Sequence, residues 1–91
     1  MRILVTRKFE KALAGLPEEI QRIADQKIAL LTVNIHHPSL RVKKITGTEN
    51  IWEAGVTMSY RITFERFPDG YLLRNIGTHD ILRRSGKNRA C

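Results

Sequence analysis

With 91 residues, of which 42% are hydrophobic and 27% are charged, the chain has the composition of a folded protein and not of a disordered segment. Its length allows one compact domain and excludes two, because domains commonly contain about 50 to 200 residues. Sixteen Lys and Arg against nine Asp and Glu give a net charge of +7, which favours polyanions as partners, unless the charge serves only to keep the domain soluble.

The N-terminal third predicts a short strand followed by two helices. Residues 2–6 are apolar and β-branched, as in a strand, and the hydroxyl group of Thr6 can cap the helix that follows. The first helix ends at Gly15, and a second helix of about sixteen residues begins at Pro17 and fades near Val33. Apolar residues recur along one face of the first helix at Phe9, Ala12, Leu13 and Leu16.

The rest of the chain is rich in β-branched and aromatic residues and predicts strands separated by turns. A glycine-containing stretch at 46–50 and the Pro-Asp-Gly sequence at 68–70 supply two of the turns. Strands are expected at residues 40–45, 51–58, 60–67 and 71–76. The expected fold is α+β, with an N-terminal strand, a two-helix hairpin and then a three- to four-stranded antiparallel sheet, in a single domain at 1–84 with a flexible tail at 85–91.

The third of these strands has residues of different character on its two faces. Alternation sends Tyr60, Ile62 and Phe64 to one face and Arg61, Thr63 and Glu65 to the other. We expect the helices to cover the apolar face and the opposite face to remain wet. Arg61, Glu53 and Arg74 are then free to point towards a ligand.

Cysteine and histidine usage bears on compartment and on metal binding. Cys91 is the only cysteine, so no disulfide and no thiolate metal cluster can form within the chain, which favours a reducing compartment. The adjacent His36 and His37 point apart in an extended segment, and no ordered set of ligands completes a tetrahedral site, so neither a metal nor another cofactor is expected. The first residues show no signal-peptide core and no apolar run approaches the roughly 18 residues of a membrane span, so we expect a cytoplasmic protein.

Three phrases carry a resemblance to a known family: HPSLRVKKITG at 37–47, SYRITF at 59–64 and GTHD at 77–80. Together with the order of predicted elements, they make nearly the whole chain resemble the RelE/ParE toxin superfamily, in particular its RelE and YafQ-like mRNA interferases. The resemblance implies a microbial-RNase-like architecture and the toxin role in a toxin–antitoxin pair. It also implies metal-independent endoribonuclease activity on mRNA, often on the ribosome, and a cognate antitoxin as partner.

The implied reaction needs a proton-transfer group. A base removes the proton of a ribose 2′-hydroxyl, the oxygen attacks the adjacent phosphate, and an acid protonates the leaving 5′-oxygen. His79 is the first candidate, because the resemblance to the YafQ-like branch places a catalytic histidine in this GTH phrase and an imidazole exchanges protons near neutrality. Alternatively, His79 only helps Thr78 and Asp80 to begin a C-terminal helical turn.

The resemblance also implies that Arg61 contacts the scissile phosphate, where a guanidinium can grip two oxygens. Glu53 is a candidate base beside it, although the glutamate of the YoeB-like branch stands nearer Arg41 and Val42. The alternative for both side chains is an ordinary ion pair across the sheet, with Glu53 or with Glu65 as the partner of Arg61.

Lysine and arginine residues supply the remaining candidates. Lys43 and Lys44 point to opposite faces of a strand, so at most one faces the cleft, and Lys44 is the one assigned to catalysis; an exposed surface pair is the alternative. Contacts to RNA are assigned to Arg41, Lys43, Arg74, Arg83 and Arg84. The last two lie near the C-terminus, where the alternative is a solvated segment without a role in binding.

Three departures from the family pattern leave rival functions open. Gly55 and Ser59 stand where the YafQ-like pattern has a further histidine and an aspartate, and the tail has no tyrosine. One rival is a ParE-like inhibitor of DNA gyrase without catalytic residues, and another is an inactive relative that binds RNA. Trp52 and Tyr71 either stack on bases or pack in the core.

Overall fold

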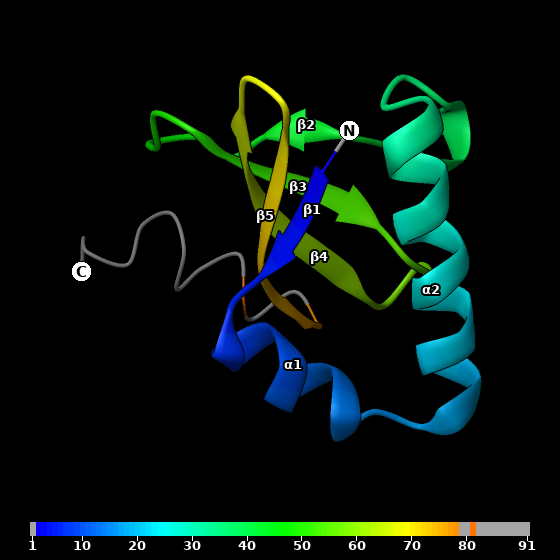
Figure 1. The fold of residues 1–91 in the computed structure, drawn as a ribbon. Helices are drawn as coiled ribbons and strands as arrows, with labels where there is room; N and C mark the ends of the chain where they lie inside the picture. Colours follow the sequence, from blue (N-terminus) through cyan, green and yellow to red (C-terminus); the bar gives the residue numbers. More distant parts are fainter. Residues whose placement is uncertain (1, 79–80, 82–91) are drawn as a thin grey trace.

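A single five-stranded sheet with helices on one side makes up the fold (Figure 1). The structure is a computed structural model and describes residues 2–78 and 81. Its elements are β1 (Arg2–Val5), α1 (Arg7–Ala14), α2 (Glu18–Val33), the 3-10 helix η1 (Pro38–Leu40), β2 (Lys43–Lys44), β3 (Ile51–Gly55), β4 (Arg61–Phe67) and β5 (Gly70–Gly77). The predicted α+β order of one strand, two helices and an antiparallel sheet is confirmed. Neither helix described is long and apolar enough to cross a bilayer.

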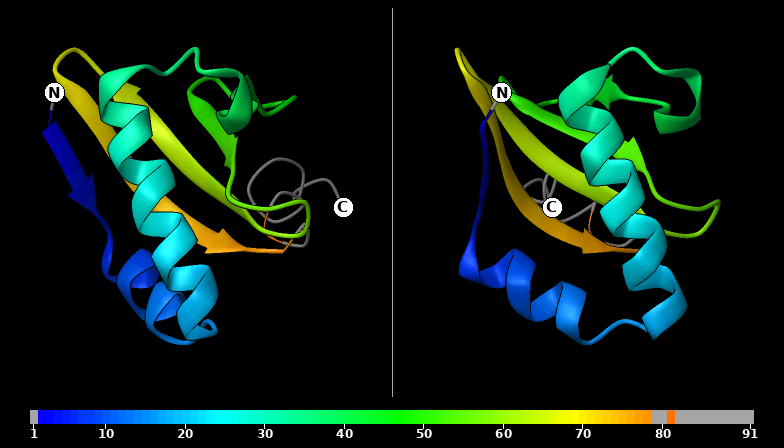
Figure 2. Two further views of the ribbon diagram at one scale, coloured as in Figure 1. Left: turned by 90° about the vertical axis from the view of Figure 1, so that its right-hand side faces the viewer. Right: turned by 45° about the vertical axis from the view of Figure 1, so that its right-hand side comes forward.

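The predicted cap at Thr6 is confirmed and also joins the helical layer to the sheet. Its hydroxyl oxygen accepts a hydrogen bond from the backbone N–H of Phe9 at 3.0 Å, which satisfies a donor of the first helical turn. The same hydroxyl donates to the carbonyl oxygen of Arg74 on β5 at 3.0 Å. The start of α1 is therefore fixed against the sheet, and α2 follows after Pro17 and crosses one face of it (Figure 2).

The strands lie in the order β1-β5-β4-β3-β2. From β2 to β5 every neighbour is antiparallel, and the turn between Phe67 and Gly70 closes the β4–β5 hairpin. β1 adds to the outer edge of β5 in the parallel direction, with Arg2 opposite Gly70 and Val5 opposite Leu73. The N-terminal strand thus makes the sheet mixed, a pairing that the sequence pattern does not specify.

The strand predicted at 40–45 is wrong over most of its length. Pro38 occupies the first turn of η1, which the His37 side chain caps by accepting from the backbone N–H of Ser39 at 3.2 Å. Arg41 then adopts a left-handed conformation with φ of 49°, so regular pairing is limited to Lys43–Lys44. The strand predicted at 51–58 likewise ends at Gly55.

The apolar core forms where the helices face the sheet, as predicted. Its largest fully buried apolar side chains are Phe9, Leu31, Leu40, Ile62, Phe64 and Leu73. The expectation that the opposite face is wet is wrong at its centre, where Thr63 is 0%, Glu53 7% and Asn75 8% exposed. One cause is Ile81, which is buried and lies against Gly77 on this side.

Candidate functional site

Polar side chains form a row across the sheet on the face opposite the helices, here called the polar face. Residues directly opposite each other on paired strands share a face. Glu53, Thr63 and Asn75 are such partners on β3, β4 and β5, and Arg61 lies in the next row, between Gly55 and Gly77. The sheet thus gathers polar groups from three strands, two of them charged, in one place.

Arg61 and Glu53 are brought together as an ion pair. The Arg61 Nε lies 3.2 Å from Glu53 Oε1, and the two side chains are only 14% and 9% exposed. Arg61 also donates from one terminal nitrogen to the carbonyl oxygen of Thr57 at 3.0 Å. The ion-pair alternative is therefore present with Glu53, whereas Glu65 pairs with Arg74 at 2.6 Å.

Arg41 reaches the same place from outside the sheet. Its Nη2 donates to the Thr57 carbonyl oxygen at 3.0 Å, the same distance as the Arg61 nitrogen. The two donor nitrogens are therefore separated by at most twice that distance, and two guanidinium groups converge on one oxygen. Gly55 makes the approach possible, because a Cβ at this position would overlap the Arg41 guanidinium.

Two like charges next to one carboxylate leave an excess of positive charge at this site. Arg41 is exposed, whereas Arg61 is mostly buried. Such an arrangement can hold an anion with delocalised charge, such as a phosphate, since each guanidinium offers donors in a planar fork. The sequence placed Arg41 in a basic strip but did not predict this convergence. The glycine at position 55, within a predicted strand, is the one feature of the sequence that is consistent with it.

The expectation that Lys44 faces the cleft is wrong. The register places Lys43 opposite Glu53, on the polar face, and Lys44 opposite Trp52, on the helix side of the sheet. Both lysines are exposed. A strand of two residues places one side chain on each face, so only one of the two lysines can lie on the polar face, and that lysine is Lys43.

Thr63 was not among the predicted site residues. Its hydroxyl oxygen is buried and has no hydrogen-bond partner among residues 2–78 and 81. A buried polar atom without a partner costs about 1–3 kcal/mol, so its persistence at the centre of the polar row calls for an explanation. The neighbouring Asn75 side chain is engaged, since its oxygen accepts from the backbone N–H of Ile76 at 2.9 Å.

Several predicted residues are not brought into this cluster. Arg74 is half-exposed and engaged with Glu65. His79, Arg83, Arg84 and the tail at 85–91 lie outside the described residues. Gly77, two positions before His79, is the direct partner of Arg61. Across residues 2–78 and 81, no group of three His, Cys, Asp or Glu side chains has the spacing to hold a metal ion.

The chain was compared with known protein families, curated proteins and solved structures. No family model and no curated protein matches the sequence. Solved structures match most of it. RelE in the RelB–RelE antitoxin–toxin complex from Methanococcus jannaschii is 22% identical, with a TM-score of 0.72 over 87% of this chain and 93% of that one. The chain has the RelE/ParE toxin fold.

Two further solved structures are similar to this chain over most of its length. A chain of the DinJ–YafQ toxin–antitoxin complex from E. coli is 14% identical, with a TM-score of 0.75 over 89% of this chain and 94% of that one. A YoeB/ParE toxin from Agrobacterium tumefaciens is 9% identical, with a TM-score of 0.74 over 87% and 99%. At such identities the shared feature is the backbone, and the predicted resemblance to the superfamily is confirmed at the level of fold.

Proposed function

We propose that the chain is the toxin of a toxin–antitoxin pair and that it cleaves mRNA on the ribosome, in the cytoplasm, without a metal ion. The observation that carries the proposal is the convergence of the Arg41 and Arg61 guanidinium groups on the Thr57 carbonyl oxygen beside Glu53. The RelE-like fold supports it, because the solved structures named above are of toxins.

In the proposed mechanism a ribose 2′-oxygen attacks the neighbouring phosphorus, and negative charge accumulates on the phosphoryl oxygens. Arg61 and Arg41 stabilise this charge, since both groups carry a fixed positive charge. Lys43 takes the part first assigned to Lys44, because it stands opposite Glu53 on the polar face. Arg74, Arg83 and Arg84 are kept as contacts to the RNA backbone.

Proton transfer is assigned to Glu53 and His79. Glu53 accepts the 2′-hydroxyl proton, or else orients Arg61 through the ion pair at 3.2 Å. His79 protonates the leaving 5′-oxygen, and its assignment depends on its sequence position two residues after the partner of Arg61. The bond from phosphorus to the 5′-oxygen breaks as the bond to the 2′-oxygen forms, which yields a cyclic phosphate and a free 5′-hydroxyl group.

The proposed partner is a cognate antitoxin. RelE and YafQ were solved in complexes with RelB and DinJ. A protein with a net charge of +7 associates favourably with an acidic segment, and charge complementarity raises both the association rate and the specificity of such a complex. A disordered acidic segment that folds on binding fits this requirement.

The test is cleavage of a reporter transcript in a translation reaction. Arg61→Lys keeps a positive charge beside Glu53 but loses the two-oxygen grip, so we expect cleavage to slow by roughly 10²- to 10³-fold. Arg22→Lys makes the same exchange at an exposed position of α2, away from the proposed site; it is the matched control and should cut at nearly the parental rate.

His79→Ala tests the proton-transfer assignment in the same reaction, and loss of cleavage is expected. Equal slowing by Arg61→Lys and Arg22→Lys would contradict the proposed site. Intact transcripts together with inhibited gyrase would replace the nuclease with a ParE-like inhibitor, and RNA that is bound but never cut would indicate an inactive relative.

A further inference from the structure

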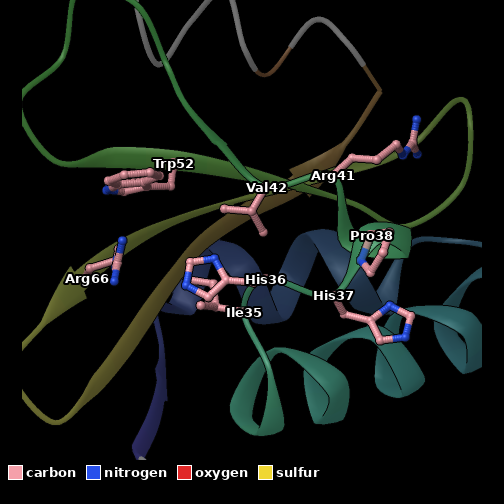
Figure 3. A pocket seen from close by; sticks show the side chains of 8 residues that line it. All are labelled: Ile35, His36, His37, Pro38, Arg41, Val42, Trp52 and Arg66. Carbon is pink, nitrogen blue, oxygen red and sulfur yellow. The ribbon is translucent and has the colours of Figure 1, made fainter.

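A second concave site lies on the helix side of the sheet, between the segment that follows α2 and the strands β3 and β4 (Figure 3). Its cavity has a volume of about 390 Å³, within the range of small-ligand pockets. Ile35 and Val42 form an apolar wall on one side, and Trp52 and Arg66 form the other. The site is separate from the Arg61 cluster, because Trp52 and Arg66 belong to the opposite face of the sheet.

Trp52 and Arg66 are held as a stacked pair. The Arg66 guanidinium carbon lies 4.9 Å from the centroid of the indole ring, a cation–π distance. Asn50 bridges the two residues: its side-chain oxygen accepts from the indole Nε1 at 3.3 Å, and its nitrogen donates to the backbone carbonyl oxygen of Arg66 at 2.8 Å. On this side of the pocket, the indole ring of Trp52 and the positive charge of Arg66 are therefore already in place before a ligand binds.

The charge around the pocket is of one sign. In the described part of the chain, no Asp or Glu lines the pocket and no ion pair uses Arg66. Lys44 is exposed and stands opposite Trp52 on the same face. The pocket thus fits an anionic group attached to a flat or apolar one.

Arg41 connects this pocket to the proposed site of cleavage. It lines the pocket, but its side chain points away from it in Figure 3 and reaches the Thr57 carbonyl oxygen that Arg61 also contacts. Between the two sites runs β2, an edge strand of two residues with Lys43 on one face and Lys44 on the other. Positive charge therefore continues around the edge of the sheet.

We propose that the pocket binds one nucleotide of single-stranded RNA, with the base against Trp52 and the phosphate on Arg66, in a strand that passes around β2 to Arg61. This inference rests on the proposed function for the identity of the strand. A nucleotide supplies both a π face and a negative charge, and stacking on an aromatic side chain is tolerant of base identity. A lone carboxylate satisfies only Arg66 and leaves the indole and the apolar wall uncovered.

Trp52 is the only tryptophan of the chain, so intrinsic fluorescence reports on the pocket directly. The probe is a short single-stranded 2′-O-methyl RNA, which lacks the nucleophilic hydroxyl group and cannot be cut by the full-length protein. We expect saturable quenching. Arg66→Ala should weaken binding by roughly 10- to 150-fold, the range for loss of a hydrogen bond between charged groups.

Three controls make the outcome specific. Arg22→Ala removes the same charge from an exposed position of α2 and should change the affinity little. Arg66→Lys keeps the charge but not the planar group, and it should bind less tightly than the parent. Trp52→Phe, followed by the anisotropy of labelled RNA, should retain much of the affinity because an aromatic face remains.

Binding and cleavage can fail independently. Quenching that depends on Arg66 supports the pocket even if ordinary RNA is never cut, in which case only the proposed function falls. Cleavage without quenching, or equal loss of affinity in Arg66→Ala and Arg22→Ala, overturns the pocket and leaves the proposed function in place. Equal quenching by a polyglutamate peptide also overturns it, since the surface would then recognise acidic protein.

Discussion

Replacing Glu53 with Gln removes one charge of the Arg61 pair while it keeps the shape and an acceptor oxygen. At 3.2 Å the attraction between the charges is about 5 kcal/mol for an effective dielectric constant of about 20. Desolvation offsets much of this attraction, yet removing one partner of a buried pair costs about 3–5 kcal/mol, because the other charge is left uncompensated. Arg61 keeps the Thr57 carbonyl oxygen as acceptor and Gln keeps an acceptor oxygen, so we expect a loss at or below the lower end of that range, about 2–3 kcal/mol.

The measurement is urea denaturation followed by Trp52 fluorescence, together with the thermal midpoint. For a domain of this size the loss corresponds to a fall of about 10–20 °C in Tm. Glu65→Gln is the matched control, because its partner Arg74 lies on the same sheet but the two side chains are 36% and 43% exposed. An exposed pair of this kind contributes at most about 1 kcal/mol.

Two results would refute the reasoning. If Glu53→Gln costs no more than Glu65→Gln, burial does not control the strength of these pairs. If Glu53→Gln together with Arg61→Gln costs the sum of the single losses, the two side chains are not coupled, whereas a pair in contact should give a double variant that loses less than the sum.

Three further substitutions test the fold around the site by the same denaturation assay. Thr63→Val removes a buried hydroxyl group that has no partner in the described part of the chain, and it should leave stability unchanged or raise it by up to about 1 kcal/mol; a loss greater than that would mean that the hydroxyl group is engaged. Gly70→Ala should cost more than about 2 kcal/mol, because the added Cβ overlaps the backbone carbonyl of Arg2 in β1; a neutral result would show that β1 can shift freely. Thr6→Ala should cost about 1–2 kcal/mol, since the N–H of Phe9 loses its acceptor, and Thr6→Ser should recover most of it.

Local patterns predicted the elements well where one residue controls the backbone. The cap at Thr6, the second helix ending at Val33 and the turn at 68–70 all follow from side chains that act on their own neighbours. The strand at 40–45 failed for the same kind of reason. Residues 40–45 have a strand-like sequence pattern, but the 3-10 helix that begins at Pro38 and the left-handed backbone conformation of Arg41 limit the strand there to Lys43–Lys44.

The candidate site was predicted only in part. Arg61 and Glu53 were expected on one face, because alternation along a strand fixes the face of each side chain. Their ion pair, the arrival of Arg41 and the choice of Lys43 over Lys44 depend on which residues of different strands become neighbours. Alternation within one strand fixes the face of each side chain, but it does not say which residue of the neighbouring strand lies opposite.

The sequence alone therefore determined the fold class, the order of the elements, the positive charge and the face on which Arg61 lies. These properties follow from composition and from interactions between residues close together in the chain. Only the tertiary structure decided that β1 joins β5 in parallel, that Arg41 and Arg61 share the Thr57 carbonyl oxygen and that Trp52 and Arg66 line a pocket. Each of these features depends on contacts between segments distant in sequence, and such contacts form only when the strands pair in their final register.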